Sequence, residues 1–215
     1  MNGRLLRDID RRRLLQLGAG VTGALAVPGF WTADAEAASA DSVFVGITVP
    51  LTGTYSEAGK DELRGYQLAF EQINAGDAAA QAWGLKGKGL LGRTIRHGHA
   101  DSQTKPNPAV QAQSKFISQD KAVMITGSVS SSTAAALNKL AQRERVLYMV
   151  GVSASNVTTG KDCTRHSFRS QAPAYMLAHA LAPTLVKEFG KDKKVAYLVP
   201  DYTYGTSMAA SRLMP

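Results

Sequence analysis

The residues best suited to chemistry are the hydroxyl side chains in Met124–Ala136, which reads MITGSVSSSTAAA. Apolar residues 123–125 predict a covered strand, Gly127 permits a tight turn, and Ser130 to Thr133 are caps before an alanine-rich helix. The N-terminus of a helix leaves N–H groups unpaired and carries partial positive charge, so a carboxylate could bind there without a dedicated cation. Taken alone, the stretch favours the simpler interpretation, an ordinary turn whose serines cap the helix.

The elements that must position this stretch alternate along the chain. Apolar and β-branched runs predict strands at 43–49, 93–100, 123–126, 146–150, 166–169 and 194–199. Helical spacing and capping residues predict helices at 57–74, 108–119, 131–143 and 174–189, with another beginning after 200–205. Residues 75–92 are glycine-rich and predict a long connection with a small excursion. The order predicts an α/β fold with a doubly wound parallel sheet.

Ligands of such sheets bind outside the carboxyl ends of the strands. The segments that follow the predicted strands at this edge are PLTGTYSEAG at 50–59, GSVSSST at 127–133 and GVSASN at 151–156, with PDYTYG at 200–205 as a fourth. We therefore expect hydroxyls, backbone N–H groups and tyrosines to gather at one rim. This set contains no evident nucleophile, carboxylate pair or metal, and such chemistry binds a ligand rather than transforms it.

Two motifs with a chemical meaning are incomplete. Five residues separate Gly53 from Gly59 where a phosphate-binding P-loop has four, and Asp61 stands where Ser or Thr must hold magnesium. His97 and His99 share one face of a predicted strand but have no third ligand nearby. The sequence therefore predicts neither a nucleotide cofactor nor a metal site.

A hydrolase remains as the alternative function. The segment GVSAS approximates the G-x-S-x-G nucleophile turn around Ser153, although its last position is Ser155. His166 and His179 follow in the chain, but neither they nor any acid can be assigned to Ser153 from sequence order. We keep a secreted serine hydrolase using Ser153 as the competing interpretation.

Composition and charge exclude several classes of protein. A hydrophobic content of 44% and a charged content of 20% over 215 residues are typical of globular proteins. The net charge of +8 is dispersed without interleaved aromatic residues, so we expect no nucleic-acid partner. Cys163 is the only cysteine, which excludes an internal disulfide framework. One explanation for this unpaired cysteine is a partner in sequence beyond Pro215.

The first 40 residues predict an export signal peptide. Arg11 and Arg12 precede one further residue and two leucines, the twin-arginine pattern, and a mildly apolar run at 14–27 is too short and weak to span a membrane. Small residues then offer several cleavage sites, of which we favour Ala40, leaving Asp41 as the mature N-terminus. We expect a periplasmic product formed by residues 41–215.

Taken together and in order, these segments resemble the type I periplasmic solute-binding proteins of ABC transporters, particularly the leucine/isoleucine/valine-type family. The matching segments are VGITVPLTGTYSEAGKDELRGYQLAFEQIN, ADSQTKPNPAVQAQSKFI, GSVSSSTAAA, GVSASN, FRSQ and DYTYG. The resemblance implies two αβ lobes joined by a hinge that close on a small solute, with no catalysis and no cofactor. It also implies delivery of the solute to a membrane ABC permease.

The resemblance also assigns ligand-binding positions, residue by residue. Ser130 matches the serine that holds the ligand carboxylate with a nearby backbone N–H, and Ser131 follows it. The expected ligand-binding residues in the other loops are Ser153, Ala154, Ser155, Tyr55 and Tyr204. The implied solute is a branched-chain amino acid or a related small carboxylate or amide, with urea and aromatic acids also open. Ala58 departs from the aromatic residue that amino-acid binders often carry there.

Members of this family are roughly twice as long as this chain, as two domains of ordinary size would require. We therefore expect residues 41–215 to form the N-terminal lobe and to stop early in the second lobe, which is mostly missing. Uncovered sheet and interlobe surfaces would then make the chain fold poorly or aggregate.

Overall fold

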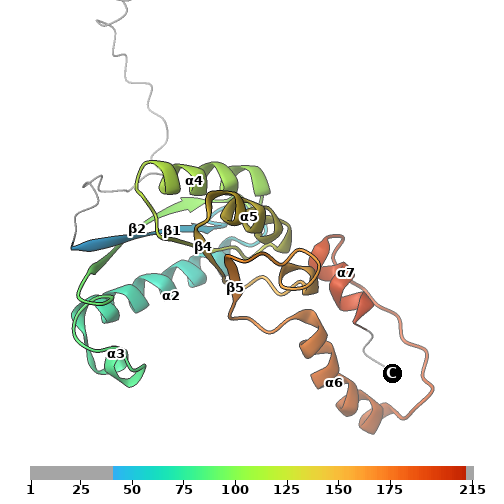
Figure 1. The fold of residues 1–215 in the computed structure, drawn as a ribbon. Helices are drawn as coiled ribbons and strands as arrows, with labels where there is room; N and C mark the ends of the chain where they lie inside the picture. The colour runs from blue at the N-terminus through green and yellow to red at the C-terminus, as the bar shows by residue number, and fades with distance from the viewer. Residues whose placement is uncertain (1–40, 212–215) are drawn as a thin grey trace, which may run out of the picture.

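The structure is a computed structural model that describes residues 41–211, so the predicted signal peptide lies outside the described residues. Its sheet has five parallel strands in the order β2-β1-β3-β4-β5 (Figure 1). The strands are β1 (Ser42–Val49), β2 (Thr94–Asp101), β3 (Met124–Gly127), β4 (Leu147–Val150) and β5 (Ser167–Arg169). The predicted α/β parallel fold is confirmed.

Helices cover both faces of this sheet, with α2 on one face and α4 and α5 on the other (Figure 1). The helical elements are α2 (Ser56–Ala75), α3 (Ala78–Ala82), α4 (Pro106–Ser118), α5 (Ser131–Glu144), the 3-10 turn η2 (Asn156–Thr158), α6 (Ala174–Phe189) and α7 (Thr203–Ala210). The short helix α3 is the excursion expected in the glycine-rich connection.

Strand β1 is the centre of the fold because it is buried along its whole length. Its residues alternate between two cores, since successive side chains of a strand point to opposite faces. Phe44 packs in the core with Phe116 of α4 and Leu137 of α5. Val45 packs in the opposite core with Phe70 of α2. This two-sided burial explains the continuous apolar run at 43–49.

The predicted strand at 194–199 is wrong. These residues have no regular secondary structure, and Val195, Tyr197 and Leu198 are exposed. A strand forms when its N–H and C=O groups pair with a neighbour, and the described sheet ends at β5 on that side. Apolar composition therefore predicted a strand that has no partner among residues 41–211.

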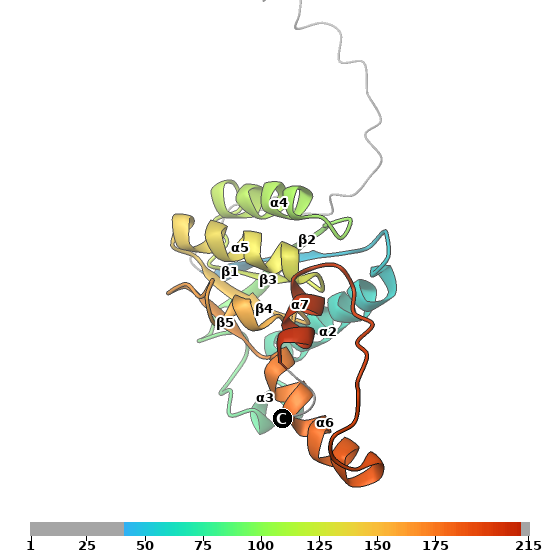
Figure 2. The same ribbon diagram turned by 90° about the vertical axis from the view of Figure 1, so that its right-hand side faces the viewer.

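The chain leaves the sheet layer after β5. Helix α6 projects away from it, residues 190–202 follow without secondary structure, and α7 returns beside α5 (Figure 2). Large apolar side chains on α6 are exposed, among them Tyr175, Met176 and Phe189. Helix α7 thus lies against α5 and η2, near the loops that leave the carboxyl ends of the strands.

The first turn of α2 packs tightly on the end of β1. Gly59 is buried, and a Cβ atom at this position would lie 1.9 Å from the carbonyl oxygen of Pro50. Gly65 lies on the same helix with nothing within 4 Å of such an atom. The close approach at Gly59 fixes how residues 50–55 leave β1.

We expect Gly59→Ala to lower the free energy of unfolding by about 1–3 kcal/mol, because the added methyl group overlaps backbone that cannot retreat. The matched control Gly65→Ala should raise it by up to about 1 kcal/mol, because alanine favours the helix. Urea unfolding followed by circular dichroism measures both. Equal stability of the two variants would contradict the proposed packing.

Candidate functional site

The topology brings three loops to one edge of the sheet. Strands β1, β3 and β4 are adjacent and parallel, so the loops at 50–55, 128–130 and 151–155 leave from the same side. The strand order reverses between β1 and β3, because the chain places β2 on one side of β1 and β3 on the other. Such a reversal is where ligands bind in open α/β sheets.

The loop between β3 and α5 forms the centre of this rim, and we call residues 128–133 the serine cradle. Gly127 and Ser128 have positive φ values of 110° and 88°, and a Cβ atom on Gly127 would lie 2.3 Å from the carbonyl oxygen of Thr48. Ser128 Oγ donates to the carbonyl oxygen of Ser130, at 2.8 Å. The turn is therefore held by its own first serine.

The cradle does not cap α5 in the expected way. Ser130 is the N-cap residue, but its side chain makes no capping hydrogen bond. Thr133, in the first turn, is buried, and its Oγ1 has no hydrogen-bond partner among residues 41–211. The predicted capping role of Ser130 is wrong. The first turn of α5 instead presents N–H groups that Ser130 does not cap, beside the Thr133 hydroxyl, which has no partner in the described part of the chain.

The loop after β4 folds onto the cradle. Ser153 Oγ donates to Ser131 Oγ at 2.9 Å, and the Ser153 N–H donates to the carbonyl oxygen of Ser128 at 3.2 Å. Ala154 is also buried, and its carbonyl oxygen accepts the Ala174 N–H at the start of α6. The structure thus joins Ser131 and Ser153, two of the residues expected at a ligand site.

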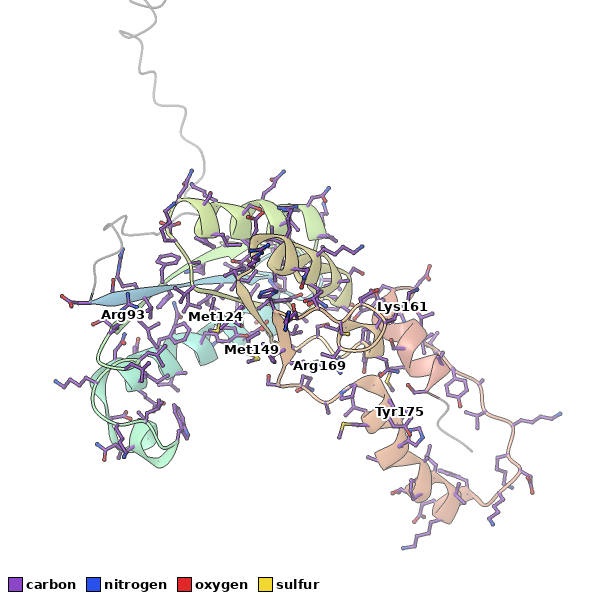
Figure 3. All side chains as sticks on the ribbon, viewed as in Figure 1. Arg93, Met124, Met149, Lys161, Arg169 and Tyr175 are labelled. Atoms are coloured by element: carbon purple, nitrogen blue, oxygen red, sulfur yellow. The ribbon has the colours of Figure 1, made fainter. Side chains whose placement is uncertain are left out.

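Ser155 faces a different partner. Its Oγ lies 2.9 Å from Ser207 Oγ of α7, and its carbonyl oxygen accepts from Arg169 Nη1 at 2.6 Å. Arg169 ends β5 and is labelled in Figure 3. Its Nη2 also donates to Thr159 Oγ1, at 2.6 Å. Arg169 therefore stabilises the loop at 151–155 by hydrogen bonds. The sequence motif FRSQ did not reveal this role.

Asn156 connects the rim to the two helices that follow. Its Oδ1 accepts the Tyr175 N–H of α6 at 2.8 Å, and its Nδ2 donates to Ser211 Oγ at 2.9 Å. Its own N–H donates to Ser207 Oγ at 3.1 Å. One amide side chain thus ties η2 to α6 and to the end of α7.

Three tyrosine rings meet beside the cradle. Tyr55 and Tyr202 have ring centroids 6.3 Å apart, and those of Tyr202 and Tyr204 are 6.2 Å apart. Burial, with a hydrogen bond to Tyr55, raises the pKa of the Tyr202 phenol. Ser132 Oγ lies 3.3 Å from Thr203 Oγ1, which brings this tyrosine cluster against the first turn of α5. Sequence reasoning selected Tyr55 and Tyr204 but missed Tyr202, which joins them.

The two segments that carry these tyrosines enter their helices in the same way. A Cβ atom on Gly205 would lie 1.9 Å from the carbonyl oxygen of Pro200, which repeats the approach of Gly59 to Pro50. In both segments, a Val-Pro pair is followed by a tyrosine and then by a glycine in the first helical turn. The same order of residue types recurs, although the spacing differs, and this order was a sequence signal for Tyr202 that could have been used.

Asp101, at the end of β2, anchors the loop at 50–55 through hydrogen bonds. Its carboxylate accepts the N–H groups of Leu51 at 2.8 Å and Gln103 at 2.7 Å, and the N–H and hydroxyl of Thr52. Burial alone would raise the pKa of Asp101, but these hydrogen bonds outweigh burial and hold it below its usual value of 3.8. A hollow of about 470 Å³ lies beside Asp101 and α4, next to the rim.

Chemistry by metal or by a serine triad has little support in the described residues. No group of three or more His, Cys, Asp or Glu residues in the range 41–211 could hold a metal ion. The His97 ring lies tilted against Phe70 with ring centroids 5.4 Å apart, and burial lowers the pKa of His97. The Nδ1 atom of His166 lies near Gln142 Oε1, and that of His179 lies near the Tyr175 carbonyl oxygen. The Ser153 hydroxyl donates to Ser131 instead of to a histidine.

Across residues 41–211, no helix combines the length and apolarity of a membrane span.

We expect Asp101→Ala to lower the free energy of unfolding at pH 7 by roughly 1–2 kcal/mol, a value that allows for the partial exposure of this carboxylate. The pKa of Asp101 is lowered by folding, so its contribution is present above about pH 4 and is lost as the pH falls through its folded pKa. The difference from the unmodified protein should therefore shrink below that pH.

Chemical unfolding at pH 7 and at several values down to pH 3 measures this difference. Asp61→Ala is the control, because Asp61 is an exposed acid paired with Arg64 on α2 and should cost under about 1 kcal/mol. A difference for Asp101→Ala that stays constant with pH would contradict the anchoring role.

Comparison with known proteins gives a consistent match. A sequence model of the family described as periplasmic binding protein matches residues 42–212. The Leu/Ile/Val-binding protein homolog 8 of Brucella suis is 28% identical over 203 residues, covering 91% of this chain and 45% of the relative. The chain therefore spans less than half the length of that relative.

Solved structures share the fold. The solute-binding protein of an ABC transporter from R. palustris, in complex with benzoate, has a TM-score of 0.64 and 25% identity, over 79% of this chain and 43% of that chain. The branched-chain amino acid transporter substrate-binding protein LivJ of Streptococcus pneumoniae, in complex with isoleucine, has a TM-score of 0.67 and 19% identity, over 79% of this chain and 45% of that chain.

Proposed function

Because this chain belongs to the periplasmic binding protein family, we propose that it is the solute-binding component of an ABC transporter and binds a small carboxylate at the serine cradle. Its relatives and structural neighbours are solute-binding proteins, not enzymes. Binding without chemistry agrees with a rim of hydroxyls and backbone N–H groups. We further propose a periplasmic location, export by the segment at 1–40 with cleavage near Ala40, and delivery of the solute to a membrane permease.

One observation carries this proposal, namely the uncapped first turn of α5. Ser130 leaves the helix N–H groups uncapped, and Thr133 Oγ1 is buried without a partner in the described part of the chain. A solute carboxylate would accept from these groups and gain from the positive end of the helix. Ser131 and Ser153, already joined at 2.9 Å, would supply further hydroxyls beside it.

The tyrosine cluster supports a solute with a flat or branched apolar body. Rings from Tyr55, Tyr202 and Tyr204 form a half-buried wall next to the cradle, and such rings offer apolar area with a polar edge. The Brucella relative is named for leucine, isoleucine and valine, and the R. palustris structure holds benzoate. A branched-chain amino acid and an aromatic acid share the carboxylate and an apolar body, so both belong to the proposed class.

The proposal requires the tyrosine segment to separate from the cradle when solute enters. Thr203 contacts Ser132 of the cradle, and Ser207 contacts Ser155 of the loop at 151–155. Asn156 adds hydrogen bonds to Ser207 and Ser211. Each is a single hydroxyl contact, of a kind that stabilises a fold by only about 1 kcal/mol. Contacts with the solute would have to replace these contacts for the segment to separate.

A panel of branched-chain amino acids, simple amides, urea and aromatic acids should contain a solute that raises the melting temperature by roughly 5–10 °C at about one hundred times its Kd. The physical reason is that solute binds the folded protein and not the unfolded chain. Differential scanning fluorimetry measures this shift. Absence of any shift across the whole panel would count against the proposal.

Ser130→Ala should weaken binding of the best panel solute roughly 10- to 100-fold, the value of a hydrogen bond to a charged group. Isothermal titration calorimetry measures the change. Ser118→Ala is the control, since Ser118 is an exposed serine at the end of α4 and should leave the affinity unaltered. Loss of binding in both variants, or in neither, would exclude a specific role for Ser130.

A further inference from the structure

Glu62 is an acidic residue of α2 whose side chain lies against the loop at 151–155. Its Oε1 accepts a hydrogen bond from Tyr66 Oη at 3.1 Å, while its Oε2 is buried and has no partner in the described residues. Burial raises the pKa of Glu62 to about 7, although hydrogen bonds from Tyr66 and from the Val152 N–H act in the opposite direction. The proposed function and the family resemblance give this residue no role.

The carboxyl group touches the start of the loop at 151–155. A Cβ atom on Gly151 would lie 1.8 Å from Glu62 Oε1 and 2.7 Å from Tyr66 Oη. Only glycine allows this approach, because any other side chain would displace both groups. The hydrogen bond from the Val152 N–H adds a polar contact to the same backbone. Glu62 therefore packs directly against the loop that carries Ser153.

The opposite side of this loop is fixed by the cradle. The Gly151 N–H donates to the carbonyl oxygen of Gly127, and the Ser153 N–H donates to that of Ser128, both at 3.2 Å. Ser153 Oγ then reaches Ser131 Oγ at 2.9 Å. The loop is held between Glu62 and the cradle, so Glu62 is placed to influence the backbone that positions Ser153.

Among the described residues, no counter-charge pairs with Glu62. Its titratable neighbours are Tyr66 on its own helix and Tyr148 on β4, and its charge raises the pKa of both phenols. No ion pair involves Glu62 within residues 41–211. Tyr66 Oη also lies 2.8 Å from Thr126 Oγ1 of β3, on the sheet face where Figure 3 shows Met124 and Met149. In this cluster, Glu62 is the group that exchanges a proton near neutral pH.

We propose that Glu62 is a positioning residue for the rim, and that the proton on its carboxyl group sets the backbone of Gly151–Ser153 and with it the arrangement of Ser153 and Ser131. The deprotonated carboxylate accepts stronger hydrogen bonds from the Val152 N–H and from Tyr66. The protonated form relieves the cost of an unpaired charge at Oε2 and accepts more weakly. The consequence for solute affinity rests on the proposed function, whereas the effect on the loop does not.

The test is a titration of the purified protein without solute, followed by NMR of backbone amides between pH 5.5 and 8.5. The Val152 amide should follow one transition with a midpoint near pH 7. Glu62→Gln should remove this transition, because glutamine carries no proton to lose. Glu57→Gln is the matched control, an exposed acid on the same helix, and should leave the transition in place.

A Val152 amide that does not titrate, or that titrates equally in Glu62→Gln, would overturn the proposal. Tyr66→Phe gives a second test, which can still be carried out if Glu62→Gln does not fold. It removes a hydrogen bond that lowers the pKa of Glu62, so the midpoint should move upward, and an unchanged midpoint would also overturn the proposal. Failure of every panel solute to bind would count against the proposed function alone, since this titration contains no solute.

Discussion

Pairing of β1 with β2 on one side and with β3 on the other is the constraint on which the rest of the structure depends. Parallel ladders bring the carboxyl ends of all three strands to one edge. The same pairing creates the strand reversal beside which the serine cradle lies. Burial of β1 on both faces provides the free energy for this arrangement, because its alternating side chains fill both cores.

The rim is built from small polar groups that satisfy one another. Hydroxyls of the cradle, the second loop and α7 meet at about 3 Å in pairs such as Ser131 with Ser153 and Ser155 with Ser207. Such pairs keep buried oxygens hydrogen-bonded at little net cost, and a solute carboxylate can replace one member. A surface of this kind suits reversible binding, because no single contact is strong enough to hold the rim shut.

The charged residues at the rim contact the backbone of its loops. Asp101 accepts hydrogen bonds from the loop at 50–55, and Arg169 donates to a carbonyl oxygen of the loop at 151–155. Glu62 lies against the start of that second loop. Each contacts the backbone of a rim loop, so each is placed to influence the geometry of the proposed site. Aromatic rings from two segments of similar design complete the wall, and both segments depend on a glycine packed against a proline carbonyl oxygen.

The sequence by itself determined the order of strands and helices, the parallel sheet and the three loops at its edge, because apolar periodicity and turn residues act locally. It also predicted that the loops carrying Ser131 and Ser153 meet at the rim, since parallel topology brings these loops together. It did not determine that Ser130 would leave α5 uncapped or that residues 194–199 would lack a strand partner. Tertiary structure also decided the roles of Glu62, Arg169 and Tyr202. Glu62 lies four residues before Tyr66 on the apolar face of α2, yet an acid in an amphipathic helix is usually solvated. Its burial depends on Gly151, which lies far away in the chain and meets Glu62 only once the sheet has formed.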